Sequence, residues 1–493
     1  MKRALFDCKR RFTKYKTYDF CYCNYFVLLL PKGNDVMEEM RILSTTAILG
    51  YGFPESSFKE ALKLNPDVIA ADAGSSDPGP YYLGSGKSFT DRNAVKRDLS
   101  FMIPEALERG IPVIIGTCGG SGADSHLEWN VDIVKEIAKE LNLDFKLAVI
   151  SSELSKDLVR NKLKEGKIEP LKPAGPLTEE NIDEAIRIVA QMGQEPFIKA
   201  LEEGAQVILA GRAYDPAVFS SLAVKNGYDA GLAIHLGKIL ECAAIASTPG
   251  SGSDCMMGFL GKDYFRVMPL SPLRKCTTLS VAAHTLYEKT NPIHLPGPGG
   301  ALDLSATTFE QYNENTVTVK GSKFVPTEKY YLKLEGVKLT GYRTVSIAAC
   351  KDPIMIDAID TIIKEVKDKV SSNFNMKEDE YFLDFKLYGK NGVMGIFKDM
   401  PQDTPNELCI IIEAVAKTQQ LSNTICSFAR STMLHYGYEG RKSTAGNLAF
   451  PFSPSDFSVG EVYEFNIYHL MEVADPCEHF PVKIYDCKRG ALV

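Results

Sequence analysis

The strongest constraint on the fold of this chain is a repeated alternation between short apolar runs and amphipathic stretches across residues 40–226. A run that is apolar throughout is typical of a strand buried on both faces, and the amphipathic stretches have the spacing of surface helices. Repeated strand–helix units predict an α/β fold, in which a parallel sheet carries helices on both faces. The predicted strands are residues 41–49, 67–71, 111–115, 145–150 and 206–210, and the predicted helices are residues 58–64, 103–110, 127–141, 181–203 and 216–226.

The pattern changes in the second half of the chain, where β-branched and aromatic residues recur at period two. Residues 292–300 are rich in Gly and Pro, which is typical of a connection. We therefore predict an α/β domain over residues 40–310 and a smaller α+β domain over residues 311–493. In the second domain the predicted strands are residues 316–333, 338–349, 381–388 and 393–397, and the predicted helices are residues 354–369 and 407–428.

Residues 1–39 differ from the rest of the chain, because they are basic and aromatic and show neither helical nor strand periodicity. Their apolar stretch is too short for a signal peptide, and no small-residue cleavage site is visible after it. We interpret this segment as a disordered extension or as the result of a translation start placed too far upstream. In the second case Met37 or Met40 is the natural start.

Charge and cysteine usage exclude several classes of protein. The chain has 56 Lys and Arg residues against 63 Asp and Glu residues, a formal net charge of -7, so no nucleic-acid partner is expected. No apolar run reaches the ~18 residues of a membrane-spanning helix, so no membrane insertion is expected. The 12 cysteines are scattered, and no CxxC pair occurs after the first 39 residues, which predicts a reducing cytoplasm rather than a structural zinc site.

Three polar loops that contain glycine directly succeed predicted strands, and in open α/β sheets ligands bind at the carboxyl ends of the strands. The first loop is DAGSSDPGPYYLGSG, residues 72–86. Its carboxylates would transfer protons, and its hydroxyls would hydrogen bond a ligand. The alternative is a turn-rich loop in which Asp and Ser side chains bond their own backbone. The candidate residues are Asp72 and Asp77 for catalysis and Ser75, Ser76 and Tyr81 for binding.

The second loop, GTCGGSGADSH at residues 116–126, leads into a predicted helix. Free backbone amides and the positive end of the helix dipole favour a bound carboxylate or phosphate. The loop matches neither GxGxxG nor a P-loop, so ATP is not predicted. The alternative is a flexible connection that ends in a helix cap at Asp124 or Ser125, and we expect Cys118 to be a small buried residue. The candidate binding residues are Thr117, Gly119, Gly120, Ser121 and Gly122.

The third loop, GRAYDP at residues 211–216, places Arg212 where its guanidinium could bind a carboxylate. The alternative is a salt bridge between Arg212 and Asp215 within the loop. Further along, His235, Lys238 and Glu241 are spaced at intervals of three, which brings them near one face of a helix. Together they would supply an acid, a base and a charge stabiliser, and a solvated helix face is the alternative.

Other polar groups give weaker signals. Cys242, Cys255 and Cys276 could ligate an iron–sulfur cluster, but their spacing matches no compact cluster motif, so the cofactor is left open. We expect His284 and His294 to be structural rather than metal ligands.

Five segments of the chain resemble the acyclic terpene utilisation (AtuA-like) family, formerly a domain of unknown function. They are residues 72–86, residues 116–124 (GTCGGSGAD), residues 211–219 (GRAYDPAVF), residues 235–242 (HLGKILEC) and residues 440–456 (GRKSTAGNLAFPFSPSD). The resemblance implies a pathway that degrades branched acyl-CoA compounds. Relatives in anaerobes accompany amino-acid fermentation and a small partner protein, which fits a hydro-lyase acting on a branched dicarboxylate. The family supplies no agreed catalytic residues.

Our first hypothesis is a cytoplasmic, homo-oligomeric lyase that adds or removes water on a small carboxylate or acyl-CoA. The Gly116–Gly122 amides and Arg212 would hold a carboxylate, while Asp72 or Asp77 and His235 or Lys238 move protons. The second hypothesis is a non-catalytic subunit that binds an acyl-CoA or a partner enzyme. The polar tail loop, residues 441–456, either faces the site or connects elements.

Overall fold

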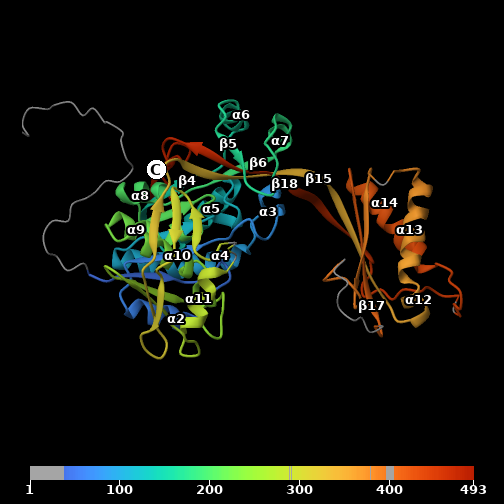
Figure 1. Ribbon diagram of the computed structural model, residues 1–493, viewed down its shortest axis with the longest axis horizontal. Coiled ribbons are helices and arrows are strands. Elements are labelled where there is room, and N and C mark those ends of the chain that lie inside the picture. Colours follow the sequence, from blue (N-terminus) through green and yellow to red (C-terminus); the bar gives the residue numbers. More distant parts are fainter. Residues whose placement is uncertain (1–37, 288, 290, 378, 396–404, 443) are drawn as a thin grey trace, which may run out of the picture. The chain divides into compact units, whose positions relative to one another are not determined.

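The structure is a computed structural model that describes residues 38–493 except 288, 290, 378, 396–404 and 443 (Figure 1). The extension predicted over residues 1–39 lies almost wholly outside the described residues. Residues Glu39–Val493 form one unit by their contacts. The division at residues 310 and 311 stays a prediction. Among the described residues, no helix is long and apolar enough to cross a membrane.

The large sheet has a parallel centre, as the sequence predicts. Its strand order is β12-β13-β9-β8-β1-β2-β3-β7-β4-β19-β20, and the pairs from β1 to β4 are parallel. The central strands β2, β3 and β7 are buried at every residue, which explains their unbroken apolar runs. The parallel strands are β1 (Met40–Ser44), β2 (Val68–Asp72), β3 (Val113–Gly116), β4 (Asp144–Ile150) and β7 (Val207–Ala210).

Antiparallel strands extend this sheet on both sides. They are β8 (Met256–Leu260), β9 (Phe265–Pro269), β12 (Thr308–Gln311), β13 (Val317–Lys320), β19 (Val482–Lys488) and β20 (Ala491–Leu492). A separate three-stranded sheet contains β10 (His294–Gly297), β11 (Gly300–Asp303) and β14 (Lys323–Pro326).

Helices cover both faces of the large sheet, which confirms the predicted fold class (Figure 1). Successive strand residues alternate between two cores, so Ile42 packs on one face and Leu43 on the other. On the first face lie α8 (Glu195–Glu202), α9 (Asp215–Lys225) and α10 (Ala230–Leu240). On the second lie α2 (Glu55–Lys63), α4 (Arg92–Arg109) and α5 (Asp124–Glu140). Shorter helices are α3 (Tyr81–Ser85), α6 (Lys156–Lys164), α7 (Glu179–Glu184) and α11 (Thr278–Leu286), with 3-10 turns η1 (Cys118–Gly120) and η2 (Ala243–Ala246).

The single long helix predicted over residues 181–203 is wrong. The chain there forms α7, then β6 (Arg187–Gln191), then α8. The middle residues of β6 are buried consecutively, and the strand pairs antiparallel with β15. A partner far along the chain therefore overrides the local helical spacing.

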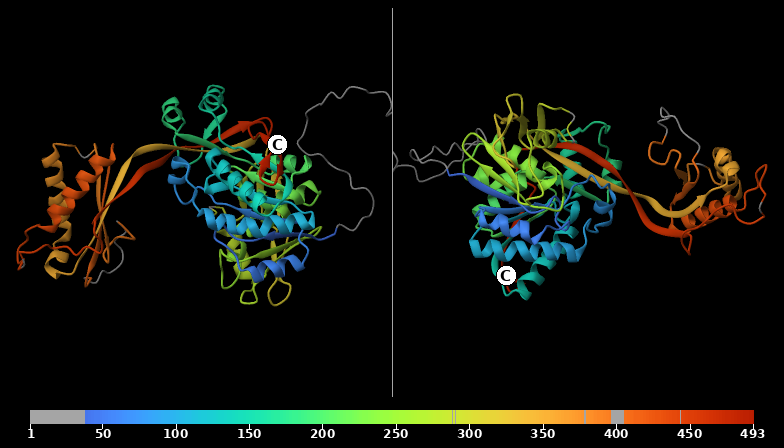
Figure 2. Two further views of the ribbon diagram at one scale, coloured as in Figure 1. Left: turned by 180° about the vertical axis from the view of Figure 1, so that it is seen from behind. Right: turned by 90° about the horizontal axis from the view of Figure 1, so that it is seen from below.

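Two long strands, β15 (Tyr330–Cys350) and β18 (Asp456–Val473), pair along their length with three register shifts (Figure 2). The first part of β15 also pairs with β6, and its last part pairs with β17 (Leu408–Ala416). The edges of this second sheet are β5 (Ile168–Pro170) and β16 (Phe382–Tyr388). Because β6 lies between two elements of the α/β region, its pairing brings the start of β15 to the large sheet.

The helices α12 (Pro353–Asp357), α13 (Ile359–Phe374) and α14 (Gln419–Leu434) pack with β15, β16 and β17 in a third core. The helix predicted over residues 407–428 is wrong, since its first part is β17, which pairs on both edges and alternates buried with half-buried residues. Thr418 caps the helix that begins after this strand. The predicted strand over residues 393–397 is a turn at 393–395, and its remainder lies outside the described residues.

Candidate functional site

A cluster of charged side chains, all buried except the half-buried Asp215, lies at the carboxyl ends of the parallel strands. Asp72 ends β2, Arg212 lies just after β7, and Asp215 begins α9. Lys238 lies in α10, and Glu241 comes directly after that helix. The sequence predicted these five residues, and Glu335 joins them from β15. The name charged cluster is used for these six residues: Asp72, Arg212, Asp215, Lys238, Glu241 and Glu335.

Asp72 has an unfilled hydrogen-bonding position. Its side chain is buried, and Oδ1 has no hydrogen-bond partner among the described residues. Oδ2 accepts a bond from the Gly74 amide at 3.3 Å. Burial raises the pKa of Asp72 well above its ordinary value, and nearby Asp215 raises it further against the opposing effect of Arg212. Burial therefore favours the protonated form of Asp72.

Arg212 is held mainly by Glu335. Its Nε donates to Glu335 Oε2 at 2.8 Å, and its Nη1 donates to the Ala213 carbonyl at 2.9 Å and to Asp215 Oδ1 at 3.3 Å. The predicted loop salt bridge between Arg212 and Asp215 is therefore present, but as the longer contact. Because both ions of the shorter pair are buried, this pair fixes β15 against the end of β7.

Glu335 is a member of the cluster that the sequence did not predict. Besides Arg212 it accepts a hydrogen bond from Ser76 Oγ at 2.7 Å and forms an ion pair with Lys333 Nζ at 2.7 Å. Burial alone would raise the pKa of Glu335, but Arg212 and Lys333 lower it to about 2. A charged residue within an otherwise apolar strand pattern indicates a buried ion pair, but the sequence does not show which residue is its partner.

Lys238 and Glu241 form a buried ion pair. The Lys238 ammonium also lies 4.6 Å from the centre of the Tyr287 ring. Burial raises the pKa of Glu241 to about 7, and Asp215 adds to this effect while Lys238 opposes it. Glu241 can therefore gain or lose a proton near neutral pH.

His235 does not face the charged cluster with a free ring nitrogen. Its Nδ1 contacts Ser322 Oγ at 2.6 Å, and its Nε2 contacts Thr285 Oγ1 at 2.9 Å. Burial, together with Lys238, lowers the pKa of His235 to about 3. His235 is therefore a buried, neutral side chain. Lys238 and Glu241, by contrast, contact each other as the sequence predicts.

The loop after β3 is enclosed by the protein. Residues 116–123 are all buried. Three of its backbone amides already donate hydrogen bonds within the protein. The Thr117 amide donates to the Gly211 carbonyl at 3.0 Å, the Gly120 amide to the Thr117 carbonyl at 3.0 Å, and the Gly122 amide to the Cys118 carbonyl at 3.1 Å. A Cβ added at Gly122 would lie 2.0 Å from the Arg212 amide, so the glycine serves the packing of two loops. Binding of an anion by Gly119, Ser121 and their neighbours stays a prediction.

The loop after β2 reaches the cluster at two points. Ser76 bonds Glu335, and Asp77 is close enough to Asp215 to raise its pKa. Ser75 Oγ instead accepts the Asp77 amide at 3.2 Å. Tyr81 packs edge-on against Tyr82 and Tyr463.

Comparison with protein families identifies the chain. Residues 85–253 and 274–452 match the model described as "Acyclic terpene utilisation family protein AtuA". The chain belongs to the AtuA family. Among curated proteins and among solved structures, nothing matches this chain. Membership implies a part in acyclic terpene catabolism.

The AtuA match covers five of the six residues of the charged cluster. It includes Arg212, Asp215, Lys238, Glu241 and Glu335, together with the loop after β3, and it begins beyond Asp72.

The cysteines and histidines that the structure describes form no cluster that could hold a metal ion. Among the residues that the structure describes, no group of three or more His, Cys, Asp or Glu side chains is placed to hold a metal ion. Cys255 and Cys276 belong to different cores, and burial raises the pKa of both. Cys118 is fully buried, as expected for a small internal residue. His294 is exposed and His284 is buried against Tyr287.

The tail loop packs with the second sheet. Asn447 donates to the Met433 and Tyr436 carbonyls at 3.2 and 2.8 Å, and Ala449 bridges to Ala349. Asp456 pairs with Arg430 at 2.7 Å. These contacts fit the alternative in which residues 441–456 connect elements.

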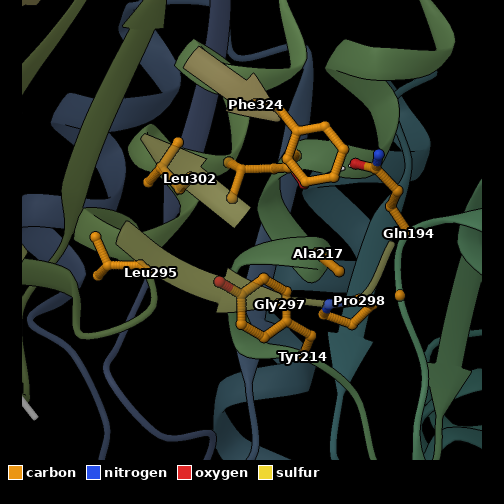
Figure 3. Close-up of a pocket in the computed structure, with 11 residues that line it drawn as sticks. Gln194, Tyr214, Ala217, Leu295, Gly297, Pro298, Leu302 and Phe324 are labelled. Atoms are coloured by element: carbon orange, nitrogen blue, oxygen red, sulfur yellow. Dashed lines mark hydrogen bonds between the residues drawn. The ribbon is translucent and has the colours of Figure 1, made fainter. Parts of the chain in front are cut away.

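An apolar crevice lies beside the charged cluster at Tyr214 (Figure 3). Tyr214 packs against Gly297, where an added Cβ would lie 3.0 Å from the ring. Gln194 and Ser220 supply the polar groups, bonded to each other at 3.3 Å. The open space is about 10 Å³, enough for one water molecule. A larger ligand would have to move the three-stranded sheet or the Tyr214 ring.

Proposed function

We propose that this AtuA-family chain is an enzyme that adds water to, or removes water from, a small branched carboxylate or its thioester. The observation that carries the proposal is the pairing of two acids in one buried site. Asp72 is buried with one oxygen unbonded among the described residues and has a raised pKa, and the pKa of Glu241 is raised to about 7. Two carboxyl groups whose environments give them different protonation states are typical of acid–base catalysis.

The two acids suit the two proton transfers of a dehydration. Ionised Glu241 takes the proton from the carbon next to the substrate carboxylate or thioester. Asp72 donates its proton to the hydroxyl on the adjacent carbon as the carbon–oxygen bond breaks, so water leaves and a double bond forms. Exchange with solvent then returns both acids to their starting states. Hydration is the same sequence in reverse.

Negative charge that develops on the substrate oxygen needs a fixed cation. Lys238 is buried beside Glu241 and is charged, because Glu241 raises its pKa against the effect of burial. A buried ammonium stabilises an enolate-like oxygen more strongly than water does. Arg212 could accept a substrate carboxylate by giving up Asp215, its longer contact.

A non-catalytic subunit that binds an acyl-CoA or a partner enzyme is the second candidate. The enclosed loop after β3 and the crevice at Tyr214, with room for one water, offer little space for a substrate, which favours a subunit that binds a partner enzyme. In that case the charged cluster would stabilise the fold and would not turn over a substrate.

The test begins with a hydration and dehydration screen of the purified full-length chain. The substrates are branched unsaturated mono- and dicarboxylates, the corresponding hydroxy acids and their CoA thioesters. Asp72→Asn and Glu241→Gln should lower turnover by about 10²-fold or more while a thermal shift by the same ligand persists. The matched control is Asp157→Asn, whose side chain is 87% exposed on α6 and should change neither quantity. Binding without turnover in the unmodified chain would favour the subunit, and full activity in both variants would reject the assigned residues.

A further inference from the structure

A pocket of about 420 Å³ lies between α5 and the edge of the large sheet, apart from the charged cluster. One wall is the exposed face of α5, and the other is formed by β4, β19 and β20. The proposed acid–base mechanism does not use this pocket. Its apolar surface consists of Leu127, Val131, Val149, Pro481, Tyr485 and Leu492.

The charge of the pocket is one-sided. Asp124, Glu128 and Asp132 stand four residues apart on α5, so their carboxylates line one face of the helix. Lys483 is the single cation among the lining residues, and Lys135, further along α5, pairs with Asp132 at 3.2 Å. Glu153 accepts the Asp124 amide at 3.0 Å, which brings a further carboxylate next to Asp124. An occupant with positive charge and apolar side chains complements this surface.

The sheet beside the pocket has an unpaired edge. The strand β19 pairs with β4 over its full length, but β20 covers only Cys487 and Lys488. The Asp486 amide and carbonyl point to the outer edge, since both bond Val493. Backbone groups alternate in direction along a strand, so those of Ile484 point to the same edge, where no described strand pairs.

The free edge and the pocket belong to the same strand. Lys483 and Tyr485, which flank Ile484, supply part of the pocket wall. A segment that paired with this edge would direct alternate side chains toward α5. Its cations would meet Glu128 and Asp132, and its apolar residues would cover Tyr485 and Leu492.

We propose that this surface binds an extended, basic segment of a partner chain by adding a strand to β19, with side chains seated in the pocket. Main-chain hydrogen bonds supply affinity in this mode of recognition, and the pocket supplies specificity. An exposed strand edge is otherwise a site of unwanted pairing, and a partner strand would cover it.

The probe is a fluorescein-labelled octapeptide of alternating Lys and Leu, titrated with the full-length chain and followed by anisotropy. We expect saturable binding, and hydrogen exchange should show slower exchange at the Ile484 amide. A version with alternate backbone nitrogens methylated should bind about tenfold more weakly or not at all, because it cannot pair with the edge. An alternating Glu and Leu peptide should not bind.

The protein variant is Glu128→Lys/Asp132→Lys, which we expect to weaken binding of the Lys and Leu peptide by about tenfold or more. Its matched control is Glu55→Lys/Glu60→Lys on α2, two exposed acids with the same total charge change. If both variants weakened peptide binding equally, the effect would come from the net charge of the protein alone, and the proposal would be overturned. Absence of binding, or equal binding of the methylated peptide, would overturn it as well.

Discussion

Glu335 and Glu241 are both buried glutamates paired with a cation, yet their pKa values move in opposite directions. The pKa of Glu335 falls to about 2, whereas that of Glu241 rises to about 7. Glu335 contacts two cations and a hydroxyl, whereas Glu241 forms an ion pair with one cation, Lys238, and lies near a carboxylate, Asp215; Lys289 has a smaller effect on its pKa. Both side chains are buried, so the number and sign of the neighbouring charges decide whether the pKa falls or rises. A glutamate with a lowered pKa stays ionised and stabilises the fold, whereas one with a pKa near 7 can exchange a proton.

The largest expected effect is the loss of the structural acid. Glu335→Ala leaves Arg212 buried without its shorter ion pair, so we expect the free energy of unfolding to fall by about 3–5 kcal/mol. Urea denaturation measures this change. The control is Glu464→Ala, an exposed partner of Lys338, which should cost less than about 1 kcal/mol. If both variants lost the same unfolding free energy, the buried ion pair of Glu335 would stabilise the protein no more than an exposed one.

Glu241→Gln tests the other half of the comparison. Glutamine keeps the shape of the side chain but cannot accept a proton, so turnover should fall by about 10²–10⁴-fold. The free energy of unfolding should change less than in Glu335→Ala, because the ammonium of Lys238 still contacts the face of the Tyr287 ring after the substitution. Steady-state kinetics with a substrate from the screen measures the first quantity. A stable and fully active variant would remove Glu241 from the mechanism.

The two glutamates also predict opposite pH effects on stability. The folded-state pKa of Glu241 lies above its ordinary 4.5, so its stabilising contribution is complete below about pH 4.5 and is lost as pH rises through 7. The contribution of Glu335 is complete above about pH 4.5 and is lost as pH falls toward 2. We expect Glu241→Gln to flatten the decline in unfolding free energy between pH 5 and pH 8, on the order of 2 kcal/mol. An unchanged slope would contradict the assigned shift.

The smallest effect concerns the ring beside Lys238. Tyr287→Leu removes the aromatic face and should cost about 1 kcal/mol, while Tyr287→Phe keeps the face and should cost less. Thermal denaturation of both variants, in parallel with Glu241→Gln, measures the difference. If Leu and Phe behave alike, the ring does not stabilise the ammonium.

The alternation of strands and helices could be predicted because it depends on local spacing. The consecutive buried residues of β2, β3 and β7 are visible in the sequence as apolar runs, and Asp72 and Arg212 lie at the ends of two of them. The predictions for two segments were wrong for a shared reason. Residues 187–191 and 408–416 form strands that pair with β15, and a local pattern does not show a distant partner.

By itself, the sequence determined the α/β class, the family and the polar loops at the strand ends, since each depends on residues close together in the chain. Only the tertiary structure decided which charges meet. Arg212 and Glu335 are 123 residues apart, and His235 is enclosed by residues far along the chain, among them Ser322 and Thr285, where burial lowers its pKa to about 3. Protonation depends on the local dielectric and on neighbouring charges, and folding alone brings these together.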